Sequence, residues 1–306
     1  MGVFQGSSLG PLLYTIFAND VSLFTENADI IQYADDTQVL VSGPKSSLSD
    51  LIRRMESTLC SLDSWLRANS LKVNASKTQL VLFGSQQNLR NVPSFTVKFR
   101  EAQLSPVPTV RNLGVTFDQT LSWTPHVSAI TNRCTGLLIG LAHLRSHLPQ
   151  RALQTVIPAL ILPHIRYCLA VYGNGSKSNT VRLQKILNFA AKVIFGRKKF
   201  DHVSDLLQRL GWLSAGDMAT LRTLSLAHSV LCSGEPERLA SSFILNSQIR
   251  DRPTRQDNKF RLPRPRTEAG KRTFLYRASS GLNQLPPHSL SLSASSFKAL
   301  VSSHFT

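Results

Sequence analysis

Apolar and polar residues follow three distinct patterns along the first part of the chain. Apolar side chains follow Gly10-Pro11 and predict a short helix, because proline is favoured in the first turn of helices. Two apolar runs, Ile30–Tyr33 and Val39–Val41, flank a polar pair and predict a β-hairpin. Between residues 48 and 66 apolar residues recur every three or four positions, which predicts an amphipathic helix of about five turns.

Short apolar runs further along the chain predict additional strands. Leu80–Phe83 is closed by Gly84 and is predicted to form one strand. Phe95–Phe99 and Leu113–Phe117 predict a further strand pair. Strands that follow one another in sequence are expected to pair antiparallel. Residues 1–125 are therefore predicted to form an α+β unit with an antiparallel sheet.

Beyond Trp123 the apolar spacing becomes helical. The predicted helical segments are Leu137–Leu144, Ala152–Leu162, Leu183–Phe195, Val203–Leu210 and Met218–Leu231. Residues 126–248 are therefore expected to form an all-helical domain. Residues 249–306 are expected to form a basic tail, and three prolines between residues 250 and 277 predict that this tail is extended.

Charge is distributed unevenly and adds a functional expectation. The net charge is +17, but residues 1–83 hold six Lys and Arg against eight Asp and Glu, so the remainder carries +19. Ten basic residues fall between Arg250 and Arg277, against three acidic ones. A slightly acidic segment followed by a strongly basic one is typical of carboxylate chemistry combined with binding to a polyanion.

The composition argues against several classes of protein. The four cysteines lie far apart without a C-x-x-C pair, so neither a disulfide partner nor a cysteine-built zinc site is expected. Met1–Leu13 lacks the basic start and apolar run of a secretory signal. The most apolar stretch, Val156–Val171, is interrupted by proline, histidine and arginine. We therefore expect an intracellular protein of the nucleus, the cytoplasm or both, neither secreted nor inserted into a membrane.

Two adjacent carboxylates, Asp35 and Asp36, stand at the tip of the predicted hairpin. Hairpin tips usually carry Gly or Asn, and neighbouring negative charges repel each other. A divalent metal would offset this repulsion, because Mg²⁺ binds one or two carboxylates together with substrate phosphates. The alternative is an ordinary solvated turn. The apolar runs on both sides of Tyr33-Ala34-Asp35-Asp36 favour the metal site.

Several blocks of residues match one known family in their order and spacing. Tyr33-Ala34-Asp35-Asp36 is similar to that family's catalytic hairpin, Gln5–Tyr14 to its upstream glutamine-glycine segment, and Trp65–Thr78 to the block after the hairpin. Further similar blocks are Asn112–Trp123, Pro163–Cys168, Leu183-Gln184, Ala190-Ala191, Leu282–Pro286 and Ser296–Lys298. In these blocks the chain resembles the reverse transcriptases of non-LTR (LINE-type) retrotransposons, over the C-terminal part of the polymerase reading frame.

This resemblance implies a fold, a reaction and its partners. The fold class would be α+β: a partial reverse-transcriptase palm, then an all-helical thumb-like domain and a basic extended tail. The partners would be an RNA template, a DNA primer and deoxynucleoside triphosphates. In the family's two-metal mechanism the primer 3′ oxygen attacks the α-phosphorus and pyrophosphate leaves, which implies Mg²⁺ or Mn²⁺ as the cofactor.

The resemblance also assigns roles to particular residues. Asp35 would be a main metal ligand and Asp36 a weaker or structural one, both in the catalytic site. Lys77 would act beside the departing pyrophosphate as a cation or proton donor. The alternative for Lys77 is an ordinary solvated lysine on a loop. The nucleotide and template pocket would be lined by Gln5, Gly6 and Tyr33.

The chain also departs from the family's pattern. The family's first catalytic carboxylate lies on a palm strand upstream of the glutamine-glycine segment, which begins here at residue 5. We therefore expect that strand and the fingers to be missing, with an exposed sheet edge and poor solubility as consequences. Because a two-metal site that loses a bridging carboxylate should lose most of its activity, the chain alone is expected to be inactive.

Basic residues in the second half are predicted to contact nucleic acid through its phosphates. They are Arg197, Lys198, Lys199, Arg261, Arg264 and Arg266. For the first three the alternative is a solvated basic surface of a helix. For the whole chain the alternatives to a polymerase fragment are a non-catalytic nucleic-acid-binding remnant and a translated pseudogene fragment without function.

Overall fold

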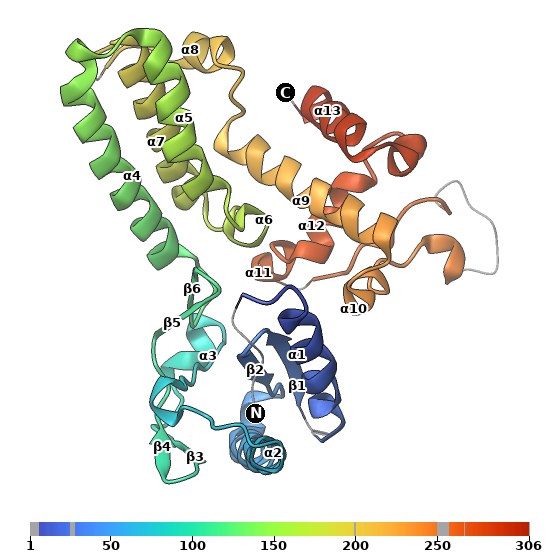
Figure 1. Ribbon diagram of the computed structural model, residues 1–306. Helices are drawn as coiled ribbons and strands as arrows, with labels where there is room; N and C mark the ends of the chain where they lie inside the picture. The colour runs from blue at the N-terminus through green and yellow to red at the C-terminus, as the bar shows by residue number, and fades with distance from the viewer. Residues whose placement is uncertain (1–5, 25–27, 199, 250–256, 266, 306) are drawn as a thin grey trace. The chain divides into compact units, whose positions relative to one another are not determined.

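The chain folds into two compact units of different architecture. The computed structural model describes residues 6–24, 28–198, 200–249, 257–265 and 267–305 (Figure 1). Unit 1 comprises Met1–Val110 and Asp118–Thr120, and unit 2 comprises Arg111–Phe117 and Leu121–Thr306. The predicted combination of helices with small antiparallel sheets is confirmed.

Unit 1 is built around one long helix. Helix α1 (Gly10–Ala18) has proline in its first turn, as predicted, and continues into the 3₁₀ helix η1 (Asn19–Phe24). Helix α2 (Leu48–Ala68) buries one face that includes Leu62 and Trp65, which confirms the predicted amphipathic helix. The other helical turns of this unit are η2 (Lys45–Ser47), η3 (Ala75–Lys77) and α3 (Gln86–Arg90).

The strands form small two-stranded sheets. Strands β1 (Asp29–Tyr33) and β2 (Asp36–Leu40) pair antiparallel, which confirms the predicted hairpin. The other pairs are β3 (Val97–Phe99) with β4 (Ala102–Leu104), and β5 (Thr109–Asn112) with β6 (Val115–Asp118). Among the described residues no strand joins these pairs into a larger sheet.

Two strand predictions are wrong. Phe95–Phe99 does not pair with Leu113–Phe117, because each segment pairs with the strand beside it in sequence, where closing the connecting loop costs less entropy. Leu80–Phe83 is not a regular strand, since only Leu80 forms a bridge, which it makes with Pro106. A short apolar run alone does not define a strand here, because no neighbouring strand among the described residues is joined to it by a short turn.

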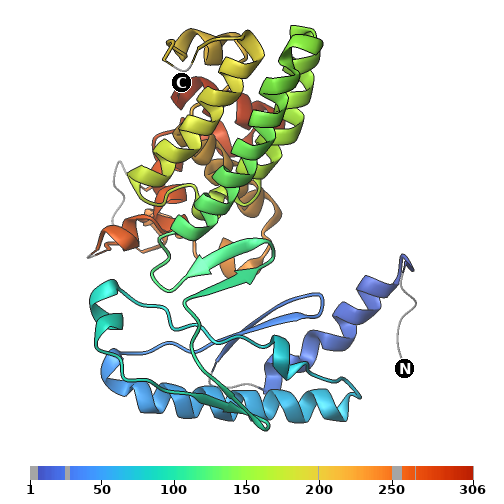
Figure 2. The same ribbon diagram turned by 90° about the vertical axis from the view of Figure 1, so that its left-hand side faces the viewer.

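Unit 2 is helical, and all five predicted helical segments are confirmed. Helices α4 (Thr124–Leu144), α5 (Gln150–Arg166) and α7 (Lys177–Phe195) run side by side in both views (Figures 1 and 2). Their facing residues, among them Leu138 and Leu187, are fully buried in one large apolar cluster. The following elements are η4 (Arg145–His147), α6 (Leu169–Tyr172), α8 (Ser204–Arg209), α9 (Ala215–Ser233), α10 (Glu237–Ala240) and η5 (Asn246–Gln248).

The expectation of an extended tail is wrong for residues 268–305. This part contains α11 (Glu268–Lys271), α12 (Phe274–Leu282), η6 (Pro287–Ser291) and α13 (Ala294–Phe305). The prolines at 263 and 265 precede the first of these helices, so they do not interrupt them. Ala278, Leu282, Phe297 and Val301 are buried with residues of α9 in a second apolar cluster, which stabilises these helices.

The four cysteines differ in how far they are exposed to solvent. All four cysteines are free, with Cys134 buried and Cys60 and Cys232 exposed. Burial raises the pKa of the Cys134 thiol to about 11. In the part of the chain that the structure describes, no helix combines the length and the apolar composition needed to cross a membrane.

Candidate active site

The two carboxylates occupy a tight turn between β1 and β2. Tyr33 pairs with Asp36, so Ala34 and Asp35 form a two-residue connection. Ala34 has a φ of 52°, a conformation that hairpin turns usually give to glycine. The side chains of Asp35 and Asp36 are both exposed at this tip. The turn therefore presents two negative charges to solvent on a backbone that is strained at Ala34.

Tyr14 of α1 lies close to the hairpin tip. Burial, followed by the negative charge of Asp35, raises the pKa of the Tyr14 hydroxyl. The Asp35 carboxylate is therefore near enough to the upstream glutamine-glycine segment for its charge to act on Tyr14. Tyr14 belongs to the sequence block noted above, but the influence of the Asp35 charge on it depends on the tertiary structure, which spacing along the chain does not reveal.

The residues predicted to line the nucleotide pocket are described in part. Gln5 lies outside the described residues. Gly6 is exposed with a φ of 87°, and a Cβ atom added there would meet nothing within 4 Å. Its backbone is therefore open to a ligand, in a conformation that L side chains rarely adopt. Tyr33, at the end of β1, leaves 65% of its surface exposed.

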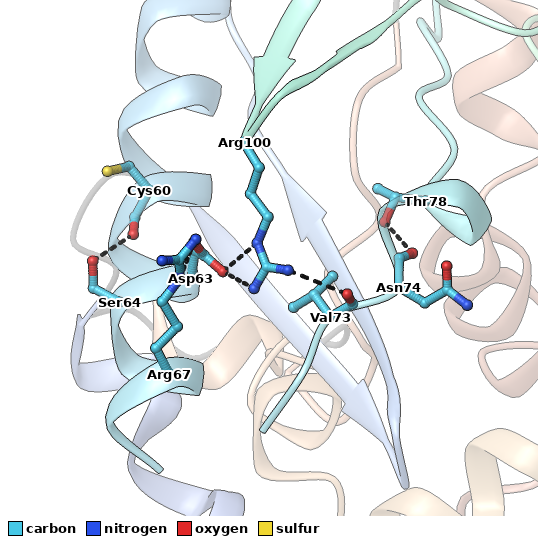
Figure 3. Close-up of polar contacts among 8 residues, drawn as sticks. All are labelled: Cys60, Asp63, Ser64, Arg67, Val73, Asn74, Thr78 and Arg100. Carbon is cyan, nitrogen blue, oxygen red and sulfur yellow. Dashed lines mark hydrogen bonds and ion pairs between the residues drawn. The ribbon is translucent and has the colours of Figure 1, made fainter. Parts of the chain in front are cut away.

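Lys77 lies at the end of the short 3₁₀ helix η3, and its side chain is exposed. Asn74 organises this turn, since its Oδ1 accepts hydrogen bonds from the Ser76 N–H (3.2 Å) and hydroxyl (2.6 Å), and its carbonyl accepts from the Lys77 N–H (3.1 Å). The hydroxyl of Thr78 also donates to the Asn74 carbonyl (Figure 3). Among the described residues no ion pair joins Lys77 to a carboxylate.

A partly buried ion pair connects this segment to α2. The Nε and Nη2 atoms of Arg100 both donate to Asp63 Oδ1, the first at 2.7 Å, and Arg100 Nη1 donates to the Val73 carbonyl at 3.3 Å (Figure 3). Arg67 donates from Nε to the other Asp63 oxygen at 2.9 Å. The hydrogen bond from Arg100, assisted by the charges of both arginines, holds the pKa of the Asp63 carboxyl below its ordinary value.

Arg100 and Asp63 were not singled out in the sequence. They are 37 residues apart, and opposite charges at such a separation carry no periodic signal. Arg100 occupies the turn between β3 and β4 with a φ of 56°, while Asp63 is on α2. Together they tie the carbonyl of Val73, four residues before Lys77, to α2.

The two carboxylates at the hairpin tip are suitable ligands for a divalent metal ion. Two exposed carboxylates match a Mg²⁺ or Mn²⁺ ion that completes its coordination with water and substrate phosphates. Among the described residues no group of three or more acidic, histidine or cysteine side chains is placed to hold a metal ion. The described donor set therefore suits ions bound jointly with substrate.

The six predicted nucleic-acid contacts belong to unit 2. Arg197 and Lys198 follow the C-terminal end of α7 and are exposed, and the Lys198 N–H donates to Asp201 Oδ2 at 2.8 Å. Arg261 and Arg264 are exposed on the segment before α11. The Arg261 N–H donates to the Ile244 carbonyl at 2.8 Å, which anchors that segment. The remaining two, Lys199 and Arg266, lie outside the described residues.

The sequence is similar to known reverse transcriptases. Residues 1–117 match the family described as reverse transcriptase (RNA-dependent DNA polymerase). The "Probable RNA-directed DNA polymerase from transposon BS" of Drosophila melanogaster is 30% identical over 205 residues, 63% of this chain and 22% of that protein. The RNA-directed DNA polymerase from mobile element jockey of the same species is 24% identical over 269 residues, 83% of this chain and 28% of the polymerase.

A third relative is the "Probable RNA-directed DNA polymerase from transposon X-element" of Drosophila melanogaster, 29% identical over 207 residues, 65% of this chain and 22% of that protein. No solved structure matches the chain. The class that these matches define is the RNA-directed DNA polymerases. Within it, the chain is similar to the reverse transcriptases of non-LTR, LINE-type retrotransposons. It spans between 22% and 28% of the length of these three relatives.

Proposed function

We propose that unit 1 carries part of the nucleotidyl-transfer site of a reverse transcriptase and that unit 2 holds the template and primer. The observation that carries this proposal is the exposed Asp35-Asp36 pair on a strained two-residue turn, within the segment that matches the polymerase family. The substrates are an RNA template, a DNA primer and deoxynucleoside triphosphates. These two roles also agree with the charge distribution, since the slightly acidic segment lies in unit 1 and most basic residues follow it in the sequence.

In this proposal each residue has a defined task. Asp35 is a main ligand for Mg²⁺ or Mn²⁺, and Asp36 is a weaker or structural one. The metal supplies charge neutralisation for the reacting phosphates when it is bound. Gly6 leaves its backbone open to the substrate, with Gln5 and Tyr33 beside the nucleotide and template. Lys77 offers its ammonium group to the departing pyrophosphate as a cation or proton donor, on the turn that Asn74 organises.

We infer further that the 306-residue chain by itself does not extend a primer. Two-metal transfer needs acidic groups that position and neutralise both ions together. Support comes from the described residues, which gather two carboxylates at the hairpin tip and no group of three potential ligands. We also propose that the chain consists of a palm portion, a thumb-like helical region and a basic tail, because its sequence blocks occur in the same order as in the family.

Two measurements test the site and the expected inactivity separately. Electron paramagnetic resonance of Mn²⁺ reports binding, which should weaken in Asp35→Asn and stay unchanged in Glu101→Gln, a matched loss of one exposed carboxylate in the same unit. Primer extension on an RNA template should give no product with the wild-type chain. If the wild-type chain extends the primer and Asp35→Asn does not, the expected inactivity of the chain is wrong but the role of Asp35 is supported. If Asp35→Asn extends the primer as well, the proposed metal site at Asp35 is overturned.

A second candidate function is nucleic-acid binding without catalysis. It is favoured by the exposed basic residues of unit 2, including Arg197, Arg261 and Arg264. Filter binding of single-stranded RNA and DNA at increasing salt tests it, because phosphate contacts weaken steeply as salt rises. A translated pseudogene fragment without function predicts no binding at all. Affinity that does not change with salt would count against phosphate contacts.

A further inference from the structure

A hollow of about 800 Å³ opens within unit 2. The C-terminal end of α5, one face of α9 and the first turns of α13 line it. Three basic side chains, Arg166, Arg222 and Lys298, are among the lining residues, and no aspartate or glutamate is. Its volume lies within the range of small-ligand sites, about 300–1,000 Å³.

Arg166 and Arg222 line the same hollow, where no aspartate or glutamate accompanies them, and their charges interact. Partial burial, followed by the positive charge of Arg222, lowers the pKa of Arg166. The ion pairs found in the described part of the chain involve other arginines and lysines. Two guanidinium groups held together in this way repel each other, and a bound anion would convert that repulsion into charge-assisted hydrogen bonds.

Neutral hydrogen-bond donors complete the lining. Arg222, Ser225, Ser229 and Cys232 recur every three or four residues, so they share one face of α9. The Oγ atom of Ser225 is buried and has no hydrogen-bond partner. Ser293 precedes the 12-residue helix α13 and accepts a hydrogen bond from the Ser296 N–H at 3.2 Å, which places the positive end of the helix dipole at this wall.

We propose that this hollow binds a phosphate group, and that the phosphate belongs to the backbone of a nucleic-acid strand. The arginines would grip the phosphate oxygens with paired N–H donors, and Lys298 would add a third positive charge. The choice of a strand as the source of the phosphate rests on the proposed function, whereas the phosphate chemistry rests on the lining residues. The site is not visible in the sequence, because its three cations come from helices 56 to 132 residues apart.

Fluorescence anisotropy with a labelled 20-nucleotide single-stranded RNA or DNA tests the proposal on the full chain. Arg166→Gln and Arg222→Gln should each weaken binding several-fold and lower the slope of log affinity against log salt by about 0.7. The matched control is Arg209→Gln, which removes the same charge from an exposed position of α8 that does not line the hollow. The control should change the affinity and the slope less than either variant.

A second measurement uses the wild-type chain and does not depend on how the variants fold. Cys232 is an exposed free thiol that lines the hollow, and Cys60 is an exposed free thiol in unit 1. A bound strand should slow alkylation of Cys232 by iodoacetamide and leave the rate at Cys60 unchanged. Inorganic phosphate and a deoxynucleoside triphosphate, each tested alone, distinguish a free anion from a strand as the source of the phosphate.

The outcomes separate this proposal from the proposed function. If a strand binds but Cys232 reacts at its original rate and Arg222→Gln behaves like Arg209→Gln, the hollow is not the site, and nucleic-acid binding stands. If no strand binds, the assignment to a strand is overturned together with the template-holding role of unit 2. Protection of Cys232 by inorganic phosphate alone would then identify a site for a free anion.

Discussion

The two units differ in how much apolar surface each buries by itself. Among the described residues, the largest cluster of unit 2 contains 19 buried residues and a second cluster nine, whereas two clusters of unit 1 contain three each. Helix α1 of unit 1 leaves Leu12 57% and Ile16 64% exposed. Isolated two-stranded sheets are marginally stable in water. The residues proposed for chemistry therefore lie in the unit with the smaller core, and the helical unit has the more extensive core of its own.

The largest expected effect comes from opening the core of unit 2. Ile161 is fully buried on α5, so Ile161→Ala should lower the free energy of unfolding by about 2–5 kcal/mol through lost burial and a residual cavity. Urea unfolding followed by circular dichroism measures the change. Its neighbour Leu160 is 41% exposed, so Leu160→Ala should cost much less. Equal losses from both substitutions would show that the helices do not pack around this core.

The same difference in burial explains how far the fold could be predicted. In unit 2 the buried positions recur at helical spacing, so α4, α5, α7, α8 and α9 were all found. In unit 1 the short strands carry few apolar residues, so the apolar pattern does not identify their partners. Each strand pairs with the one reached by a short loop, and the predicted partner of Phe95–Phe99 is therefore wrong. The helices of the tail are not evident from the sequence, because prolines and basic residues dominate residues 250–277 and the helical apolar spacing begins only at Phe274.

The candidate site was predictable where its residues are adjacent in sequence. The Asp35-Asp36 pair could be located because two apolar runs flank it, and the hairpin confirmed that arrangement. The approach of Tyr14 to Asp35 and the Asp63–Arg100 ion pair join separate elements, so they required the tertiary structure. The hollow around Arg166 and Arg222 is the extreme case, since its three basic side chains come from three helices, α5, α9 and α13.

The next largest effect tests what stabilises unit 1. Asp63 is 14% exposed and accepts hydrogen bonds from two arginines, so Asp63→Asn should cost about 1.5–3 kcal/mol at neutral pH. Because the folded state lowers the Asp63 pKa, this contribution is complete above the pKa of about 4 of an unfolded aspartate and is lost as pH falls through the folded-state value. Thermal unfolding of both proteins from pH 7 to pH 2 measures it.

An exposed ion pair on the same helix provides the control for Asp63. Asp50 pairs with Arg53, whose side chain is 81% exposed, so Asp50→Asn should change stability by at most about 1 kcal/mol. If the two substitutions cost the same at neutral pH, the Asp63–Arg100 pair contributes no more than a surface pair. If the Asp63→Asn loss persists unchanged at pH 2, it arises from packing and not from the charge.

A smaller effect of opposite sign is expected at the hairpin tip. Ala34 has a positive φ, so Ala34→Gly should stabilise unit 1 by about 0.5–1 kcal/mol by relieving backbone strain. Ala102 in β4 has an ordinary strand backbone, and Ala102→Gly should destabilise by about 0.5–1 kcal/mol. Thermal unfolding measures both changes. Destabilisation by Ala34→Gly would show that the strain at the tip is absent.

The smallest change in stability is expected on the exposed face of α1. Ile16 is 64% exposed, so Ile16→Gln should change the free energy of unfolding by no more than about 0.5 kcal/mol while reducing self-association, measured by light scattering at increasing concentration. Leu62 is 6% exposed in the core beside Trp65, so Leu62→Gln should destabilise strongly. A comparable loss from Ile16→Gln would show that Ile16 belongs to the core. Higher solubility at unchanged stability would show that unit 1 presents an apolar face that its own folding does not require.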